Sequence, residues 1–330
     1  MLEKNKKPIK EIILSSTIIF FVVIFIFFLC DFCCYSLVYK KQIDYLKTNK
    51  NRYVPKFNYS LKLEDFNKEY KIIKQNDFRK PLGVDSNKKS IVVFGCSFAF
   101  GYVYPEEQTI SYQLYKNTKR PVYNRAFCSW GIQHMLYQLR KKSFYKEIKN
   151  PDCFIYVFIP DHVRRMYTYV FDTIDGYNLF YLRYELKNKK LEEVKINKKN
   201  IFLGSSLYKE YQNMKSHDLY NNFKENKEKT ELLKALFVES NKLLKTKYPD
   251  SRFVILKYDN SVNADQERYY LDSGVWDDLK KEGMIIISTK ELTDKNLALP
   301  DYTYNGEIDN HPNGKAWEEI VPSLVQKLKL

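Results

Sequence analysis

Apolar residues are concentrated in one long segment near the amino end of the chain. Within Ile12–Cys30 the only polar residues are two serines and one threonine. A helix of this length covers about 28 Å, which is close to the hydrocarbon thickness of a bilayer. The pattern therefore predicts a short tail over residues 1–11, followed by a single transmembrane helix over residues 12–38.

A cleaved signal peptide is the alternative interpretation of this segment. The apolar region of a signal peptide is normally shorter and ends at small residues, whereas this one ends in Phe27-Phe28-Leu29-Cys30-Asp31. The lysines before and after the segment nearly balance, so the positive-inside rule does not decide its orientation. Because only a short tail precedes a single anchor, we expect the amino terminus inside the cell and the following domain outside.

After the anchor, short apolar strands alternate with amphipathic helices. Residues 39–88 are polar and aromatic without clear periodicity, and are interpreted as a juxtamembrane stalk and lead-in. Strands are expected at residues 90–94, 121–124, 153–159, 252–257 and 284–288. Helices are expected at residues 109–117, 131–144, 231–247, 276–281 and 312–327. This alternation predicts one α/β domain over residues 89–330, built on a central parallel sheet.

The alternation is interrupted between about residues 165 and 225, which are interpreted as an insertion in the domain. Leu182–Leu186 and Leu191–Ile196 flank the polar residues Lys187-Asn188-Lys189-Lys190. Two such segments on either side of a short polar turn predict a β-hairpin.

Charge and cysteine content limit the classes of partner. The chain has 330 residues, with 55 Lys and Arg against 40 Asp and Glu, a net charge of +15. The lysines are spread along the chain without an arginine-rich stripe or a nucleic-acid-binding motif, so no specific nucleic-acid partner is expected. A preference for anionic polymers or lipid headgroups stays open. The six cysteines lack metal-ligand spacing, and no metal or other cofactor is expected.

Two short motifs carry the candidate chemistry. Ser97 ends an apolar run in Gly95-Cys96-Ser97-Phe98-Ala99-Phe100-Gly101, and Asp309-Asn310-His311-Pro312-Asn313 precedes the last helix. In an open parallel sheet, reactive residues lie at the carboxyl ends of the strands, where a helix start also offers backbone N–H groups. Ser97 as nucleophile, His311 as base and Asp309 as orienting acid would together form a hydrolytic triad.

These motifs resemble those of the SGNH, or GDSL-like, hydrolase superfamily over about residues 88–330. The first block of that family reads Gly-Asp-Ser, and here Cys96 stands in place of the aspartate. The closing block, Asp-x-x-His or Asp-x-His-Pro, matches Asp309-Asn310-His311-Pro312. The resemblance implies a flavodoxin-like three-layer α/β/α sandwich with Ser97, Asp309 and His311 as catalytic residues.

The two middle blocks of the family are matched less closely. Asn124-Arg125-Ala126-Phe127-Cys128-Ser129-Trp130-Gly131 resembles the asparagine-to-glycine loop, with Ser129 where the donor glycine is usual. The third block normally supplies an asparagine, but this chain has Asp161-His162-Val163-Arg164. By resemblance, the oxyanion-hole candidates are Ser97, Ser129, Gly131 and His162. The candidates for lining the site are Asn124, Asp161 and Arg164.

The resemblance and the anchor together imply a membrane-anchored serine esterase whose domain lies outside the cytoplasm. The expected substrate is an acyl ester, with an O-acetyl group on cell-envelope glycan as the specific expectation. The altered middle blocks leave an alternative open. In that alternative, the chain is a catalytically weak or inactive binding partner, or an acyltransferase component, of a glycan-modification system.

Overall fold

The computed structural model describes most of the chain from residue 78 onward and a short piece near its amino end. The described residues are 18–23, 25–26, 78–101, 104–128, 130–167, 173–174, 177–178, 182, 184–193, 227–259, 274–303 and 311–330. The chain divides into two compact units. One comprises Met1–Tyr53 with Lys195–Met214, and the other comprises Val54–Val194 with Lys215–Leu330.

The second unit is built on a five-stranded parallel sheet, as the sequence predicted. Its strands are β1 (Ser90–Phe94), β2 (Val122–Asn124), β3 (Pro151–Phe158), β8 (Arg252–Lys257) and β9 (Ile285–Ser288). They lie in the order β2-β1-β3-β8-β9. Numbered along the chain, this is the 2-1-3-4-5 order of flavodoxin-like sheets, in which ligands bind where the strand order reverses, between the first and third strands.

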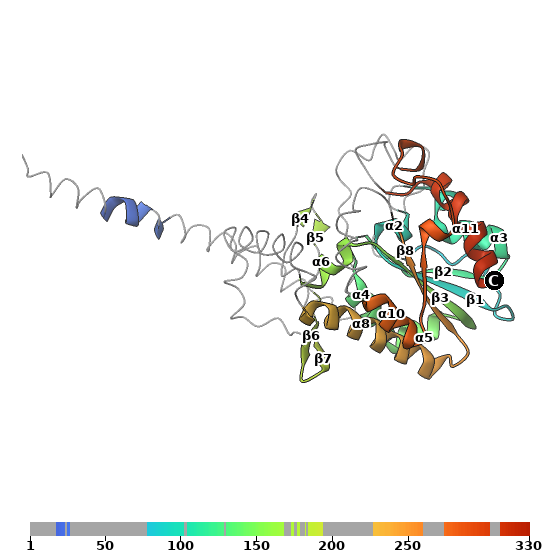
Figure 1. Ribbon diagram of the computed structural model, residues 1–330, viewed down its shortest axis with the longest axis horizontal. Helices are drawn as coiled ribbons and strands as arrows, with labels where there is room; N and C mark the ends of the chain where they lie inside the picture. Colours follow the sequence, from blue (N-terminus) through green and yellow to red (C-terminus); the bar gives the residue numbers. More distant parts are fainter. Residues whose placement is uncertain are drawn as a thin grey trace, which may run out of the picture. The chain divides into compact units, whose positions relative to one another are not determined.

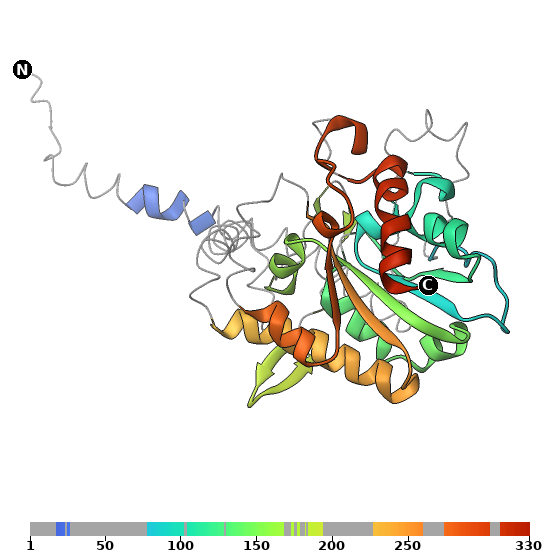
Figure 2. The same cartoon turned by 45° about the vertical axis from the view of Figure 1, so that its right-hand side comes forward.

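Helices cover both faces of this sheet, which confirms the predicted three layers. The helices are α3 (Ile110–Thr118), α4 (Ile132–Leu139), α5 (Lys142–Glu147), α8 (Lys227–Lys247), α10 (Val275–Lys281) and α11 (Gly314–Leu328). Alternate residues of each strand enter different apolar clusters because successive side chains point to opposite faces. Ile91 and Val93 join Leu114 and Trp317 in one cluster, whereas Val92 belongs to the other. Helices α3 and α11 cover one face of the sheet, and α4, α8 and α10 cover the other (Figures 1 and 2).

One predicted helix is wrong in its extent. A single helix was expected over residues 131–144, but α4 ends at Leu139 and α5 starts at Lys142. Lys141 between them is extended, which turns the chain so that Phe144 is buried against Phe94, with ring centroids 5.8 Å apart. Burial of a large aromatic side chain thus outweighs continuation of the helix.

The residues just before β1 belong to the folded unit. Leu82 forms an antiparallel bridge to Val122 of the edge strand β2, with hydrogen bonds in both directions. Residues 39–77 of the expected stalk and lead-in lie outside the described residues.

The insertion contains the predicted hairpin. β6 (Tyr184–Lys187) pairs with β7 (Lys190–Glu193) in antiparallel register, and β4 (Thr173–Ile174) pairs with β5 (Tyr177–Asn178). Asn188 and Lys189 both have positive φ, 50° and 63°, which is the backbone conformation of a two-residue type I′ turn. Residues 194–226 lie outside the described part of the chain.

Of the first unit, residues 18–23 and 25–26 are described; they are helical, and their apolar side chains are exposed. Among the residues that the structure describes, no helix is both long and apolar enough to cross a bilayer. Most of the predicted anchor over residues 12–38 lies outside the described ranges.

Candidate active site

Ser97 lies at the carboxyl end of β1, on a sharp turn into the short helix α2 (Ser97–Phe100). Gly95 makes the turn possible with a φ of +146°, a conformation that side-chain-bearing residues rarely adopt. A Cβ atom at this position would also stand 2.9 Å from the Cβ of Ala99 and 3.0 Å from the carbonyl oxygen of Val157. The chain therefore requires glycine two residues before the candidate nucleophile.

Helix α2 is held from behind by two buried side chains. The Asn124 amide donates to the Ala99 carbonyl at 2.9 Å, while its oxygen accepts from the Ala126 N–H at 3.1 Å. Asn124, a predicted site-lining residue, thus contacts the backbone beneath the nucleophile.

Arg79 supplies the larger part of this support. Its Nε donates to the Phe100 carbonyl at 2.5 Å, and its Nη2 donates to the Gly101 and Tyr104 carbonyls, both at 2.7 Å. Glu106 balances its charge at 3.0 Å. A guanidinium carries five N–H donors, so one side chain can satisfy several carbonyls at the end of a short helix. Sequence reasoning missed Arg79 because it lies in the lead-in and belongs to no motif.

His311 contacts Ser97 although it lies 214 residues later in the sequence. Its Nε2 lies 2.6 Å from the Ser97 hydroxyl oxygen, and its ring packs on Phe98 with centroids 4.8 Å apart. Local structure fixes this position. Pro312 bridges to Thr303, and the Asn313 side chain caps α11 by accepting the Ala316 N–H at 3.2 Å. Asp309, the predicted orienting acid, lies outside the described residues.

A serine hydroxyl within hydrogen-bond distance of an imidazole nitrogen can act as a nucleophile. The serine oxygen attacks an ester carbonyl while the histidine takes its proton, and the histidine later returns a proton to the leaving group. Ser97 as a residue is 8% exposed, so the candidate nucleophile is largely shielded from water. The site also follows β1, at the position where the strand order reverses.

The predicted oxyanion-hole residues differ in whether their backbone N–H groups already have a hydrogen-bond partner. Ser97 starts α2, and the Ala99 and Phe100 N–H groups behind it are bonded to the Cys96 carbonyl, so its own N–H precedes the helical bonds. Ser129 lies outside the described residues. The Gly131 N–H donates to Nδ1 of His134 at 3.0 Å, so this N–H is engaged by its own helix.

The position of His162 argues against its predicted role as a donor. Its side chain has no exposed surface, its Nδ1 lies 2.9 Å from the Tyr156 hydroxyl, and its ring packs against Tyr156 and Phe158. An oxyanion donor must face the substrate, whereas these rings belong to the apolar layer under α8 and α10. The expectation for His162 is therefore corrected to a buried packing residue.

Burial lowers the pKa values of two histidines, His134 and His162. Burial, followed by the nearby positive charge of Arg165, lowers the pKa of His134 to about 3. The same two causes hold the pKa of His162 well below its ordinary value. Because Nδ1 of His134 accepts from Gly131, its proton lies on Nε2.

Of the other candidates, Asp161 begins helix α6 (Asp161–Tyr167) and pairs with Arg165 one turn later, at 2.7 Å. Arg164 lies on the same helix, and its side chain is not among the described ones. Within the described ranges, no three metal-ligating side chains gather as they would around a metal ion.

No protein-family model and no curated protein matches this chain. Solved structures of lipolytic and esterase proteins are similar to it at low identity. A protein described as a lipolytic member of the G-D-S-L family, from Desulfitobacterium hafniense, is 10% identical with a TM-score of 0.39, over 72% of this chain and 98% of that one. A member of the same family from Veillonella parvula is also 10% identical, with a TM-score of 0.38, over 73% and 98% of the two chains.

An acetyl xylan esterase from Butyrivibrio proteoclasticus is 12% identical with a TM-score of 0.35, over 73% of this chain and 63% of that one. At such TM-scores the likeness carries no functional argument. Any function has to be argued from the contacts of this chain's own residues.

Proposed function

We infer that this protein is a serine hydrolase of the SGNH, or GDSL-like, type that acts on ester bonds. The 2.6 Å contact between the Ser97 hydroxyl and Nε2 of His311 carries this inference, because it pairs a nucleophile with a base at the carboxyl edge of a parallel sheet. The supporting glycine turn and the apolar wall formed by Phe98 are what such a nucleophile needs.

Three finer parts of the proposal rest on the sequence. Asp309 would orient the imidazole of His311 and complete the triad. Residues 12–38 would anchor the chain as a single span with the domain outside the cytoplasm. An O-acetyl ester on envelope glycan would then be the substrate, since an anchored domain at that place meets such esters.

Hydrolysis of an aryl acetate by the full-length chain tests the central inference. Replacing Ser97 with alanine should reduce kcat by about 10⁴–10⁶-fold, because removal of a nucleophile leaves only the contributions of binding and of the oxyanion site. Ser240→Ala is the matched control, since Ser240 is a buried serine that bonds the Leu236 carbonyl within α8. Equal rates for wild type and Ser97→Ala would refute the proposal.

A second candidate function has an observation in its favour. The Gly131 N–H is engaged by His134 and the His162 ring is buried, so two predicted donors are not offered to a substrate. This favours a weak hydrolase, an acyltransferase component or a binding partner that retains the fold. Transfer of acetyl from the aryl ester to an added methyl glycoside, compared with release to water, separates transferase from hydrolase. Absence of both, together with retention of glycan binding, would indicate a binding partner.

A further inference from the structure

The side chain of Arg165 joins helix α6 to the loop after β2 at the carboxyl edge of the sheet. It projects from α6, which follows β3, and its Nε donates to Asp161 on the same helix at 2.7 Å. Its Nη1 donates to the Trp130 carbonyl at 2.9 Å, in the loop after β2. The loop is also bonded to the turn after β1, since the Phe127 N–H donates to the Gly95 carbonyl at 3.2 Å. The Cys96 side chain in that turn lies near enough to the guanidinium to raise its pKa. Cys96 directly precedes Ser97.

The charge of this group is permanent. Burial alone would lower the pKa of Arg165, but Asp161 and Cys96 outweigh burial and raise the pKa above its ordinary value. The guanidinium side chain is 20% exposed, and the carboxylate side chain is 25% exposed. Such a largely buried ion pair is costly to break, because removing one partner leaves the charge of the other without compensation.

One peptide group in the loop is held at both ends. The peptide between Trp130 and Gly131 has its carbonyl bound by Arg165 and its N–H bound by His134. Gly131 also packs closely, since a Cβ there would stand 3.3 Å from the Cβ of Arg165. The orientation of this peptide determines which way the backbone groups of the neighbouring loop residues can face.

We propose that Arg165 is a positioning residue of the esterase site, which fixes the loop carrying Trp130 and Gly131 against the turn that carries Ser97. The proposal rests on the proposed function for its catalytic meaning. Arg165 acts through the backbone of the loop, since its Nη1 donates to the Trp130 carbonyl while its Nε is held by the Asp161 carboxylate. A lysine would retain the charge but not the rigid fork that reaches several acceptors together.

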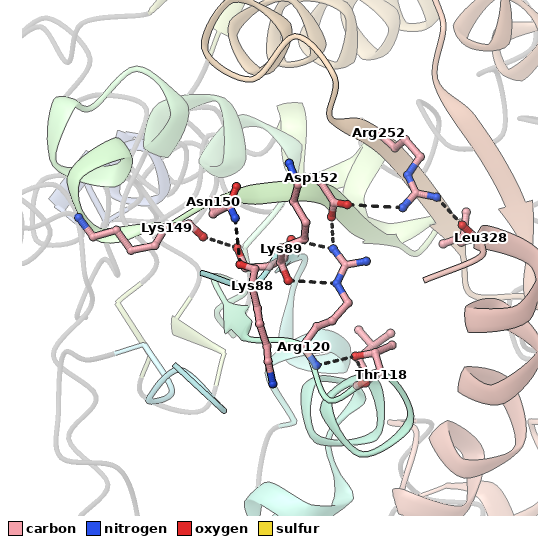
Figure 3. A network of polar contacts seen from close by, with 11 residues as sticks. Lys88, Lys89, Thr118, Arg120, Lys149, Asn150, Asp152, Arg252 and Leu328 are labelled. Carbon is pink, nitrogen blue, oxygen red and sulfur yellow. Dashed lines mark hydrogen bonds and ion pairs between the residues drawn. The ribbon is translucent and has the colours of Figure 1, made fainter. Parts of the chain in front are cut away.

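The side of the sheet where the parallel strands begin, here called its amino edge, offers a matched control. Arg120 is also largely buried, donates to the Lys89 carbonyl at 3.0 Å and pairs with Asp152 (Figure 3). It joins strand starts on the side of the sheet opposite to Ser97. Arg120→Gln therefore removes a comparable ion pair without touching the candidate site.

The experiment compares Arg165→Gln, Arg165→Lys and Arg120→Gln in the full-length chain. Reactive serine is titrated with an aryl phosphonate, and kcat and KM for an aryl acetate are expressed per reactive site. We expect Arg165→Gln to lower kcat by about 10²-fold with KM within about threefold, because a displacement of about 1 Å has that cost. Arg165→Lys should lie between it and wild type. Arg120→Gln should lower Tm without changing kcat per site.

Amide hydrogen exchange over residues 127–131 gives a second readout that does not need turnover. Exchange should speed up in Arg165→Gln and stay unchanged in Arg120→Gln. Equal kcat per site and equal exchange for the two variants would overturn the positioning role. A wild-type chain without turnover dependent on Ser97 would instead overturn the proposed function, while the exchange measurement would still decide whether Arg165 fixes the loop.

Discussion

Both edges of the sheet carry an arginine–carboxylate ion pair, but the two pairs have different roles. At the amino edge, Arg120 and Arg252 flank one carboxylate, Asp152, and tie the starts of β1, β3 and β8 together (Figure 3). At the carboxyl edge, Arg165 pairs with Asp161 and reaches a loop carbonyl beside the candidate nucleophile. An arginine–carboxylate pair therefore indicates a functional site only where reactive side chains lie next to it. Among the described residues, the serine–histidine contact of Ser97 and His311 lies at the carboxyl edge.

The largest expected difference between the edges follows from replacing His311. His311→Gln removes the base that contacts Ser97, and kcat for an aryl acetate should fall by about 10⁴–10⁶-fold. Its melting temperature should stay close to that of wild type, because the side chain is partly exposed. Steady-state kinetics and thermal unfolding measure the two effects, with Arg120→Gln as the amino-edge control. A fall in kcat of less than about tenfold would contradict the assignment of His311 as the base.

A smaller difference is expected between two glycines with positive φ. Gly95 lies at the carboxyl edge against Ala99 and Val157, whereas Gly283, just before β9 at the amino edge, has φ +80° and open space around its Cβ position. Gly283→Ala should cost about 1–2 kcal/mol of backbone strain. Gly95→Ala should cost about 1–3 kcal/mol more, because the added methyl also overpacks the core.

Urea unfolding of both glycine variants gives the free energies of unfolding. Equal losses would show that the space around Gly95 relaxes easily. They would also remove the argument that this turn demands glycine for steric reasons.

A further expected effect is a loss of stability in acid that belongs to His134 and His162, near the carboxyl edge. The pKa of His134 is about 3 in the folded chain and about 6.5 when unfolded. Above pH 6.5 both states are neutral at this group. Below it the unfolded state takes up a proton that the folded state refuses, so stability is lost as the pH falls, by about 1.4 kcal/mol per pH unit for each such histidine.

A substitution separates His134 from the other acid-sensitive groups. In His134→Gln, the unfolded state should take up one proton fewer between pH 6.5 and 5, so the free energy of unfolding should fall less steeply with decreasing pH. Urea unfolding at several pH values measures this slope. A difference between wild type and variant that does not change with pH would contradict the lowered pKa of His134.

Much of the fold could be predicted because its signals are local. Ser90–Phe94 and Arg252–Lys257 are apolar strands of the length that a doubly covered sheet requires, and Thr109 and Asn313 are ordinary helix caps. The break between Leu139 and Lys142 was missed because the helical spacing continues across it. Only the burial of Phe144 on the sheet, a tertiary contact, decides the matter.

The candidate site divides in the same way. Ser97 and His311 carry short motifs with a chemical meaning, so the sequence pointed to both before their 2.6 Å contact was known. Arg79 and Arg165 carry no motif, since a guanidinium can bind carbonyls from any position in the chain that brings it close. His162 was misjudged because its place after β3 says nothing about which face of the sheet its ring joins.

The contacts of Arg79 have a consequence for where the catalytic domain begins. The sheet starts at Ser90, yet three carbonyls around the nucleophile helix are bound by a side chain eleven residues earlier. A recombinant fragment that begins at β1 would keep every motif of the site. It would lose Arg79, whose side chain holds helix α2. The amino end of the domain is therefore set by the contacts that support Ser97, and a fragment intended for crystallisation or assay should include Arg79.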